Sequence, residues 1–266
     1  MLDATPITYQ RTKGAAHIRF GAGGALERLF QKGSGKIMLP RCHGPVPEAV
    51  FLNTAGGLTG GDRLDYRIDL APGTRLTATT QTAERAYASN EGAAEVDVTL
   101  TLGEGAHLDW LPQETILFDR AALHRTTKIE LADGATCLLA EMLTLGRAAM
   151  GETITRLDLV DRRIVTRDGA PLFVDPLRLT GGDVTARDPA GLGAATALAT
   201  IVAVAPDVDD RLDPLRRILP GTAVASAWDG KLVVRAMAAY PYRLRRDVAA
   251  VLKHLRGADL PRVWQY

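Results

Sequence analysis

Apolar and polar residues alternate without interruption from Val96 to Leu102. Successive side chains of a β-strand point to opposite faces, so this spacing places the apolar set on one face and the polar set on the other. The segment is therefore predicted to be a half-buried strand. Its buried face consists of Val96, Val98, Leu100 and Leu102.

A second pattern recurs about every thirty residues along the first half of the chain. In each copy, an apolar pair spaced two residues apart is followed by a glycine and then by a further apolar position. The copies are residues 68–76, 100–108 and 129–137. Because glycine adopts positive φ readily, it suits a tight turn between two strands. We therefore expect stacked strand-turn-strand units.

The β character continues into the second half of the chain. Asp168-Gly169 and Asp229-Gly230 lie between aliphatic or β-branched runs, which is typical of tight turns between strands. The longest apolar stretch, residues 194–205, is interrupted by two threonines and is much shorter than the roughly 20 residues that a membrane helix needs. It is predicted to be a buried strand.

Helical spacing is confined mainly to the last quarter of the chain. One helix is expected to end at Gly257, and its buried face is predicted to be Leu244, Val248, Val251, Leu252 and Leu255. A shorter helix is expected to start at Asp213, with Pro214 in its first turn, and to end before Pro220. Its predicted buried residues are Leu215, Ile218 and Leu219. With no low-complexity linker, the sequence favours one mainly β domain over residues 1–266.

Charge and composition argue against several classes of partner. The chain contains 32 Lys and Arg against 31 Asp and Glu, so it has no strong net field to attract nucleic acid or an anionic membrane. Only Cys42 and Cys137 are present, which is too few for a disulfide framework and fits a reducing compartment. The first residues lack a basic segment followed by an apolar run, so a cytoplasmic protein is expected.

The motifs of the common enzyme classes are missing from the sequence. The glycine-rich residues 56–62 lack the Lys-Ser or Lys-Thr of a phosphate-binding loop. None of the three serines lies in a Gly-x-Ser-x-Gly elbow, and the five histidines are not spaced as metal ligands. We therefore expect no catalytic residue and no tightly bound cofactor.

Carboxylates are more informative, because several stand within or beside glycine-rich or apolar stretches, where an unpaired acidic side chain is costly. These residues are Asp62, Glu84, Glu114, Glu141 and Glu152. Together they are suited to line a hydrated passage for a divalent cation. Individually, each is better suited to cap a turn or to form an ion pair than to bind a cation. Oxygen ligands do not identify the cation.

Several segments, taken in order, resemble the UreD family of urease accessory proteins. They are residues 53–62 (NTAGGLTGGD), 79–87 (TTQTAERAY), 111–118 (LPQETILF), 147–152 and 260–266. We call the first four of these the signature segments. The resemblance covers nearly the whole chain. The family's polar positions fall on Asp62, Thr80, Gln81, Tyr87, Gln113, Glu114 and Glu152, and its motif also includes Asn53, Gly56, Gly57, Gly60 and Gly61.

The resemblance implies a mainly β fold of stacked, helically wound sheets, with about two α-helices in the C-terminal quarter. It also implies a urease maturation factor that binds apo-urease and UreF, and that reaches the GTPase UreG through UreF. Such a chaperone would act in a hetero-oligomer and assist the insertion of nickel, with Ni²⁺ passing transiently through an internal polar passage. The passage candidates are Asp62, Glu114, Glu141 and Glu152.

Two other interpretations remain open at this stage. A metal-dependent hydrolase built on clustered carboxylates would require Asp62 or Glu114 for turnover. A purely structural stack of sheets would show no dependence on metal. The lack of a recognisable nucleophile, nucleotide motif or closed metal site counts against the hydrolase.

Overall fold

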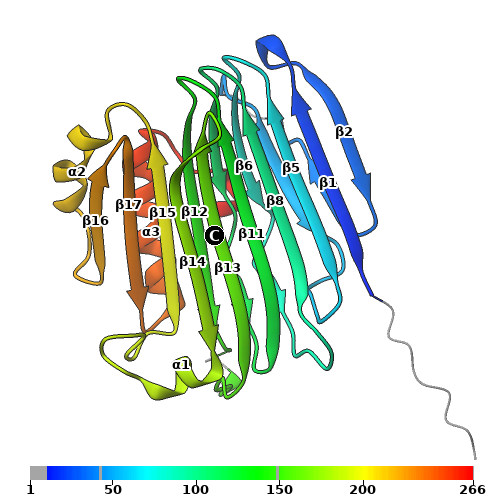
Figure 1. Cartoon of the computed structure of the whole chain (residues 1–266), viewed down its shortest axis with the longest axis vertical. Helices are drawn as coiled ribbons and strands as arrows, with labels where there is room; N and C mark the ends of the chain where they lie inside the picture. Colours follow the sequence, from blue (N-terminus) through cyan, green and yellow to red (C-terminus); the bar gives the residue numbers. More distant parts are fainter. Residues whose placement is uncertain (1–10, 42–43, 148–149, 266) are drawn as a thin grey trace, which may run out of the picture.

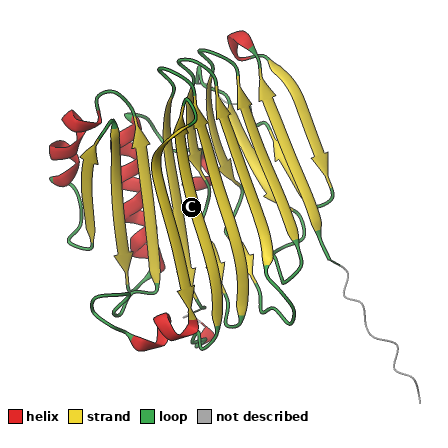
Figure 2. Cartoon of the chain, in the orientation of Figure 1, coloured by secondary structure: helices red, strands yellow, loops and turns green. Residues whose placement is uncertain are grey.

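The fold consists of two large β-sheets that pack face to face, with helices at one end (Figures 1 and 2). The computed structural model describes residues 11–41, 44–147 and 150–265. In this part of the chain, strands predominate over helices, so the predicted mainly β fold is confirmed.

The first sheet has seven strands among the described residues, and five of them run parallel. In spatial order they are β14 (Ala170–Thr180), β13 (Leu157–Arg167), β11 (Ala121–Leu131), β8 (Ala94–Leu102), β5 (Arg63–Leu70), β1 (Lys13–Phe20) and β2 (Leu26–Lys32). The end strands β2 and β14 run antiparallel to their neighbours. This sheet is called the front sheet.

The second sheet, here the back sheet, has ten strands among the described residues. In spatial order the main path is β16 (Ala223–Trp228), β17 (Lys231–Ala238), β15 (Ala197–Val204), β12 (Thr136–Leu145), β9 (His107–Leu111), β6 (Arg75–Thr80), β4 (Glu48–Asn53) and β3 (Gly35–Met38). The short strands β7 (Glu84–Ala86) and β10 (Thr115–Leu117) pair beside β12. Strands β4, β6, β9 and β12 are parallel.

The thirty-residue pattern forms the repeating unit of this architecture. Its glycines, Gly73, Gly105 and Gly134, have φ near +65° (67°, 62° and 62°) and occupy the turns β5–β6, β8–β9 and β11–β12. Each turn carries the chain from the front sheet to the back sheet, so the two strands of a unit do not pair with each other. They pair instead with the equivalent strands of the next unit. The predicted helical winding is confirmed.

The main hydrophobic core lies between the two sheets. The alternation seen in the sequence recurs in the burial of β8, where Val96, Val98, Leu100 and Leu102 face inward and Asp97 faces solvent. Phe51 is fully buried in this core and packs edge-on against Trp110, with ring centroids 5.5 Å apart. Burial of this kind contributes about 25 cal/mol per Å² of apolar surface.

A second core lies on the outer face of the back sheet, under helices α2 (Val208–Arg216) and α3 (Pro241–Arg256). The five residues predicted for the face of the long helix are those that α3 buries, and Gly257 ends it with φ +62°. The predicted buried strand is β15. Two hairpins contain the predicted turns, β13–β14 at Asp168-Gly169 and β16–β17 at Asp229-Gly230.

A shorter helix is present before Pro220 with Leu215 buried, as predicted, but its predicted start was wrong. Helix α2 begins at Val208, five residues before the expected start, and Pro214 lies inside it. Val208 and Leu215 lie about two turns apart and are both buried on one face of the helix, and their packing stabilises the earlier start although Pro214 removes one backbone N–H donor. Ile218, predicted to be buried, is 47% exposed.

A third, six-residue helix, α1 (Gly181–Ala186), was not predicted. It begins at the second copy of the pentapeptide LTGGD, where the Thr180 side chain accepts a hydrogen bond from the Asp183 N–H and caps the helix. In the first copy, residues 58–62 form a turn before β5. The identical letters therefore occupy different elements.

Candidate functional site

The signature segments meet at one edge of the back sheet. Because β4, β6, β9 and β12 are parallel, their carboxyl ends lie at the same edge. The first three signature segments follow β4, overlap the end of β6 and follow β9, and the fourth follows β12. Segments that are far apart in the sequence therefore form one set of neighbouring loops.

Two glycines in the first loop permit close approach of neighbouring chain segments. A Cβ on Gly57 would lie 2.2 Å from the Tyr87 ring and 2.9 Å from the carbonyl oxygen of Arg85. A Cβ on Gly60 would lie 2.0 Å from Ser89 Oγ. The Tyr87 hydroxyl donates a 3.1 Å hydrogen bond to the carbonyl of Gly56, and the N–H of Gly61 donates to the carbonyl of residue 93 at 2.9 Å.

An aromatic and cationic cluster joins the other loops. The rings of Tyr87 and Phe118 meet edge-on with centroids 4.8 Å apart, and the Arg147 guanidinium lies 4.2 Å from the Phe118 centroid. Glu152 accepts two hydrogen bonds from Arg147, at 3.0 and 3.1 Å, and these bonds lower the pKa of Glu152. Glu152 also accepts from the N–H of Asp119 at 3.4 Å. This carboxylate therefore connects two loops.

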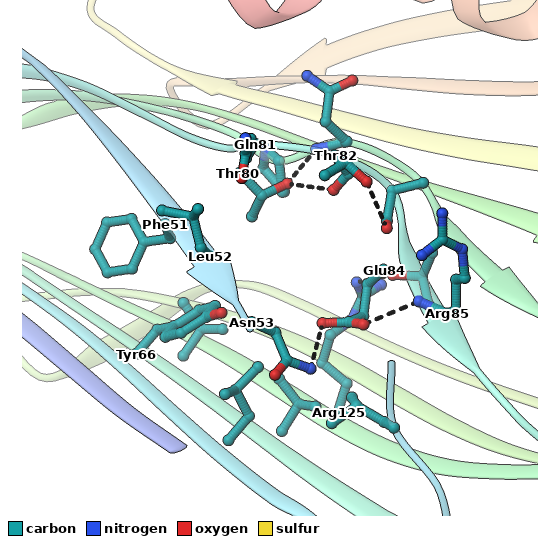
Figure 3. Close-up of a pocket in the computed structure, with 18 of the residues that line it drawn as sticks. Phe51, Leu52, Asn53, Tyr66, Thr80, Gln81, Thr82, Glu84, Arg85 and Arg125 are labelled. Atoms are coloured by element: carbon teal, nitrogen blue, oxygen red, sulfur yellow. Dashed lines mark hydrogen bonds between the residues drawn. The ribbon is translucent and has the colours of Figure 1, made fainter. Parts of the chain in front are cut away.

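A cavity of about 160 Å³ opens at this edge and extends between the sheets (Figure 3). Its polar lining comes from both sheets and the loops: Asn53, Tyr66, Thr80, Gln81, Thr82, Glu84, Arg85, Gln113, Thr115, Arg125 and Glu141. Figure 3 shows Glu84 pointing toward Asn53, across from Thr80 and Gln81. The cavity therefore places polar groups beside a largely apolar core.

Glu84 is the carboxylate near the mouth of this cavity. It accepts hydrogen bonds from Asn53 Nδ2 at 3.1 Å and from the N–H of Arg85 at 2.9 Å. Burial nevertheless dominates and raises the pKa of Glu84. Burial, with a smaller contribution from the Glu84 charge, also raises the pKa of Tyr66. A cation in the cavity would therefore stabilise the ionised form of Glu84.

Deeper between the sheets, Arg163 lies among three carboxylates. Its Nε donates to Glu141 at 2.7 Å, its Nη1 donates to Asp175 at 2.8 Å, and its Nη2 bonds Asp161. These residues are all buried. The guanidinium thereby uses all three nitrogens to satisfy groups from β12, β13 and β14.

Two more arginines extend these contacts in both directions. Arg125 binds Asp161 through two hydrogen bonds of 2.8 and 2.7 Å. Arg235 donates to Asp175 at 2.6 Å. Burial acts to raise the pKa of Asp161, but the charge and hydrogen bonds of Arg125 outweigh it and lower that pKa. We call Arg125, Asp161, Arg163, Glu141, Asp175 and Arg235 the buried ion network, although Arg235, at its outer end, is partly exposed. Its formal charges balance.

Glu141 connects this network to two separate hollows. It lines the 160 Å³ cavity together with Arg125, and it also lines a groove of about 350 Å³ together with Arg163 and Arg235. Oε2 of Glu141 accepts from Arg163, and Oε1 accepts a 2.7 Å hydrogen bond from the Thr127 hydroxyl. The buried ion network thus lies between the cavity and the groove.

Comparison with known proteins decides the family. The family model described as "UreD urease accessory protein" matches residues 12–265. A urease accessory protein UreD from Cereibacter sphaeroides is 53% identical over 263 residues, covering 97% of this chain and 93% of that protein. Proteins of the same name from Paracoccus denitrificans and a Jannaschia species are 52% and 49% identical and match 100% of this chain, covering 96% and 100% of their own lengths. The chain belongs to the UreD family.

In this UreD-family chain, the four passage candidates do not line one common cavity. Glu141 alone among them lines the cavity. Asp62 is buried at the turn before β5, where it accepts hydrogen bonds from the N–H groups of Thr12 and Thr59, at 2.7 and 2.8 Å. Glu152 connects the loops described above. Their roles toward a metal remain predictions.

Glu114, the fourth candidate, contributes to the attachment of α3. It accepts a 2.9 Å hydrogen bond from Arg245, which also bonds the side chain of Gln113 and stacks over Trp264, 4.9 Å from its centroid. The N–H of Gln113 donates to Thr80 Oγ1 at 2.9 Å. The third signature segment therefore joins the cavity loops to the C-terminal helix.

Sequence reasoning missed most of the buried ion network, although β13 carries a usable signal. Leu157, Leu159 and Val165 occupy the inward face of this strand at every second position, and Asp161 and Arg163 fall on the same face. Opposite charges on a predicted core face of one strand indicate a buried ion pair. Cys137 is buried as predicted, and burial raises the pKa of its thiol to about 12; Cys42 lies outside the described residues.

The described part of the chain contains no group of three or more His, Cys, Asp or Glu side chains arranged to hold a metal ion. None of its helices is long and apolar enough to cross a membrane. Membership of the UreD family of urease accessory proteins supports a role in urease maturation.

Proposed function

We propose that this chain is a maturation scaffold that binds apo-urease and UreF, reaches the GTPase UreG through UreF, and so enables nickel insertion into urease. The observation that supports this best is the match to the UreD family over almost the whole chain, combined with the convergence of the signature segments around one polar cavity. We further propose that the complex is a hetero-oligomer in the cytoplasm.

We also propose that Ni²⁺ passes through this chain without a tightly held site. Glu141 lines both the cavity and the groove, so its carboxylate lies at the boundary between the two. Carboxylate oxygens accept divalent cations, and three of them face Arg163. Passage therefore requires the Arg163 contacts to open transiently, since the guanidinium occupies the centre of the three carboxylates.

Omission of this chain is the primary test. Urease subunits are co-expressed with UreF and UreG, with and without the chain, and the nickel content and urease activity of the purified enzyme are measured. Nickel content and activity should both fall when the chain is absent. Unchanged nickel loading would contradict the maturation function.

A variant of Glu141 tests the passage separately. Glu141→Gln keeps the acceptor for Thr127 but removes the charge, and activation is expected to fall several-fold while complex formation persists. Glu130→Gln, on the exposed face of β11, is the matched control. The same assay on Asp62→Asn, Glu114→Gln and Glu152→Gln decides whether these predicted positions act on the ion. Normal activation by E141Q would remove Glu141 from the route.

A further inference from the structure

The back sheet extends beyond the front sheet at the C-terminal end. The front sheet ends at β14, whereas the back sheet continues from β12 through β15, β17 and β16. Helices α2 and α3 cover the outer face of these three strands. Figure 1 shows α3 behind them. On the inner face, Val202, Val204 and Val233 are buried in the main core, whereas Val224 of β16 and Met237 of β17 are exposed. The exposed part of this inner face, from β16 to the Leu198–Met237 pair of β15 and β17, is called the overhang.

Large apolar side chains are exposed on the overhang. Val224 is 67% exposed and Met237 is 40% exposed, although both belong to strands whose alternate residues are buried under the helices. Together with Leu177 and Leu198 they line the 350 Å³ groove beside β14. Trp228, 43% exposed, lies farther along the same face of β16 as Val224. An apolar surface of this kind beside an open groove is typical of a protein contact.

The groove presents one accessible charge. Three charged residues line it, and two of them, Glu141 and Arg163, are buried. The third, Arg235, keeps 44% of its side chain exposed while it donates to Thr200 at 2.9 Å and to Asp175. A ligand in the groove therefore meets apolar side chains and the edge of one guanidinium, which favours an apolar segment that carries a carboxylate.

The dimensions favour a helix as the occupant. Packed sheets are separated by about 10 Å, and an α-helix with its side chains is about 10–12 Å across. A helix therefore fills the space that the front sheet would occupy if it continued. Addition of a strand is less suitable, because the neighbouring edge strand β14 contains Pro171 and Pro176, and proline on an edge strand opposes pairing with another chain.

We propose that the overhang binds an amphipathic helix of a urease-maturation partner. The apolar face of that helix packs on Val224, Met237 and Leu198, and one of its carboxylates pairs with Arg235. This inference rests on the proposed function, because it assumes that the chain acts in complex with UreF or apo-urease. It adds the docking surface and the chemistry of the docked segment.

The test compares one substitution at two exposed valines. Val224→Asp places a carboxylate in the apolar groove near Arg235, whereas Val174→Asp places one on the outer face of β14, where Val174 is 57% exposed. Each variant is co-expressed with UreF or with apo-urease, and the affinity of the purified pair is measured. V224D should weaken binding of one partner at least tenfold, and V174D should bind as the parent does. Circular dichroism checks that both variants are folded.

A photo-reactive side chain at position 224 identifies the occupant. The cross-linked peptide is expected to come from an amphipathic helix that contains Asp or Glu. Cross-linking to an extended segment, or V224D binding both partners within twofold of the parent, would overturn the proposal. Failure of the parent chain to bind either partner would instead contradict the proposed function, so the two failures are distinguishable.

Discussion

At the scale of single residues, the buried ion network connects strands of the front sheet with strands of the back sheet. Arg163 uses its three nitrogens for three carboxylates from three strands. A buried charge that loses its partner is far more costly than an exposed one, because no water replaces the lost contact. The stability of the region between the cavity and the groove therefore depends on this guanidinium.

Replacing Arg163 tests this dependence. Arg163→Met leaves Glu141, Asp161 and Asp175 with fewer donors, and the free energy of unfolding should fall by about 3–5 kcal/mol. Arg162→Met, at the adjacent exposed position of β13, should change it by less than about 0.5 kcal/mol. Chemical denaturation of both variants measures the difference. An equal effect at the two positions would show that the network is not stabilising.

Glu84 provides a prediction of pH dependence. Its folded pKa is raised, so the stability associated with the protonated side chain is present below the unfolded pKa of about 4.3 and is lost as the pH rises through the folded value. Glu84→Gln should remove this loss. The stability of E84Q relative to the parent should therefore increase as pH rises from 4 toward 7. Denaturation series at several pH values measure it, with Glu130→Gln showing no such trend.

Residue identity alone predicted the partners of few side chains. Asp62 and Glu152 were expected either to face an ion or to cap and pair, and they accept hydrogen bonds from backbone N–H groups or from Arg147. A carboxylate beside a glycine-rich turn can either bind an ion or accept hydrogen bonds within the protein. Which of the two it does depends on the loops that the fold places next to it. Glu141 lies in β12, which is buried on both faces and shows no alternation, so the sequence did not specify the direction of its side chain.

At the scale of elements, local patterns predicted the repeating units and the long helix well. The glycine of each unit and the alternation of β8 are local properties, so they specify a turn and a strand without knowledge of neighbours. The strand pairing was harder to predict, because each turn leads to the opposite sheet and the partner of each strand lies about thirty residues away in the sequence. Helix α2 was misplaced because Pro214 was assigned to a helix start.

The loop after β4 shows how one element depends on another. Gly57→Ala would bring a Cβ to 2.9 Å from the Arg85 carbonyl as well as onto the Tyr87 ring, so β7 or the loop must move. Gly56→Ala meets nothing within 4 Å and should cost only the left-handed backbone strain of about 1–2 kcal/mol. G57A should be clearly less stable than G56A in thermal unfolding. Equal melting temperatures would contradict the close packing of these loops.

At the scale of the whole molecule, both ends of the stack present apolar surface. The overhang lies at one end, and at the other end the edge strand β2 exposes Leu26, Leu29 and Phe30 (Figure 1). Among the described residues, β2 pairs only with β1. An edge strand with apolar side chains is a site for association with other chains.

Self-association of the isolated chain is therefore expected in the absence of its partners. Leu29→Lys on β2 should reduce it, because a charged edge strand opposes pairing between copies. Light scattering at increasing protein concentration measures the effect. Val174→Lys on β14, an edge strand that already contains two prolines, is the control and should change little. A parent chain that stays monodisperse without partners would contradict this expectation.

The winding of the chain also determines how such a scaffold can vary in size. Every repeating unit adds one strand to each sheet, and its glycine turn does not depend on units farther away. Insertion or removal of one repeating unit would therefore change the distance between the overhang and the β2 edge by one inter-strand spacing of about 4.8 Å. The distance between bound partners is thus adjustable in discrete steps, without redesign of either contact surface.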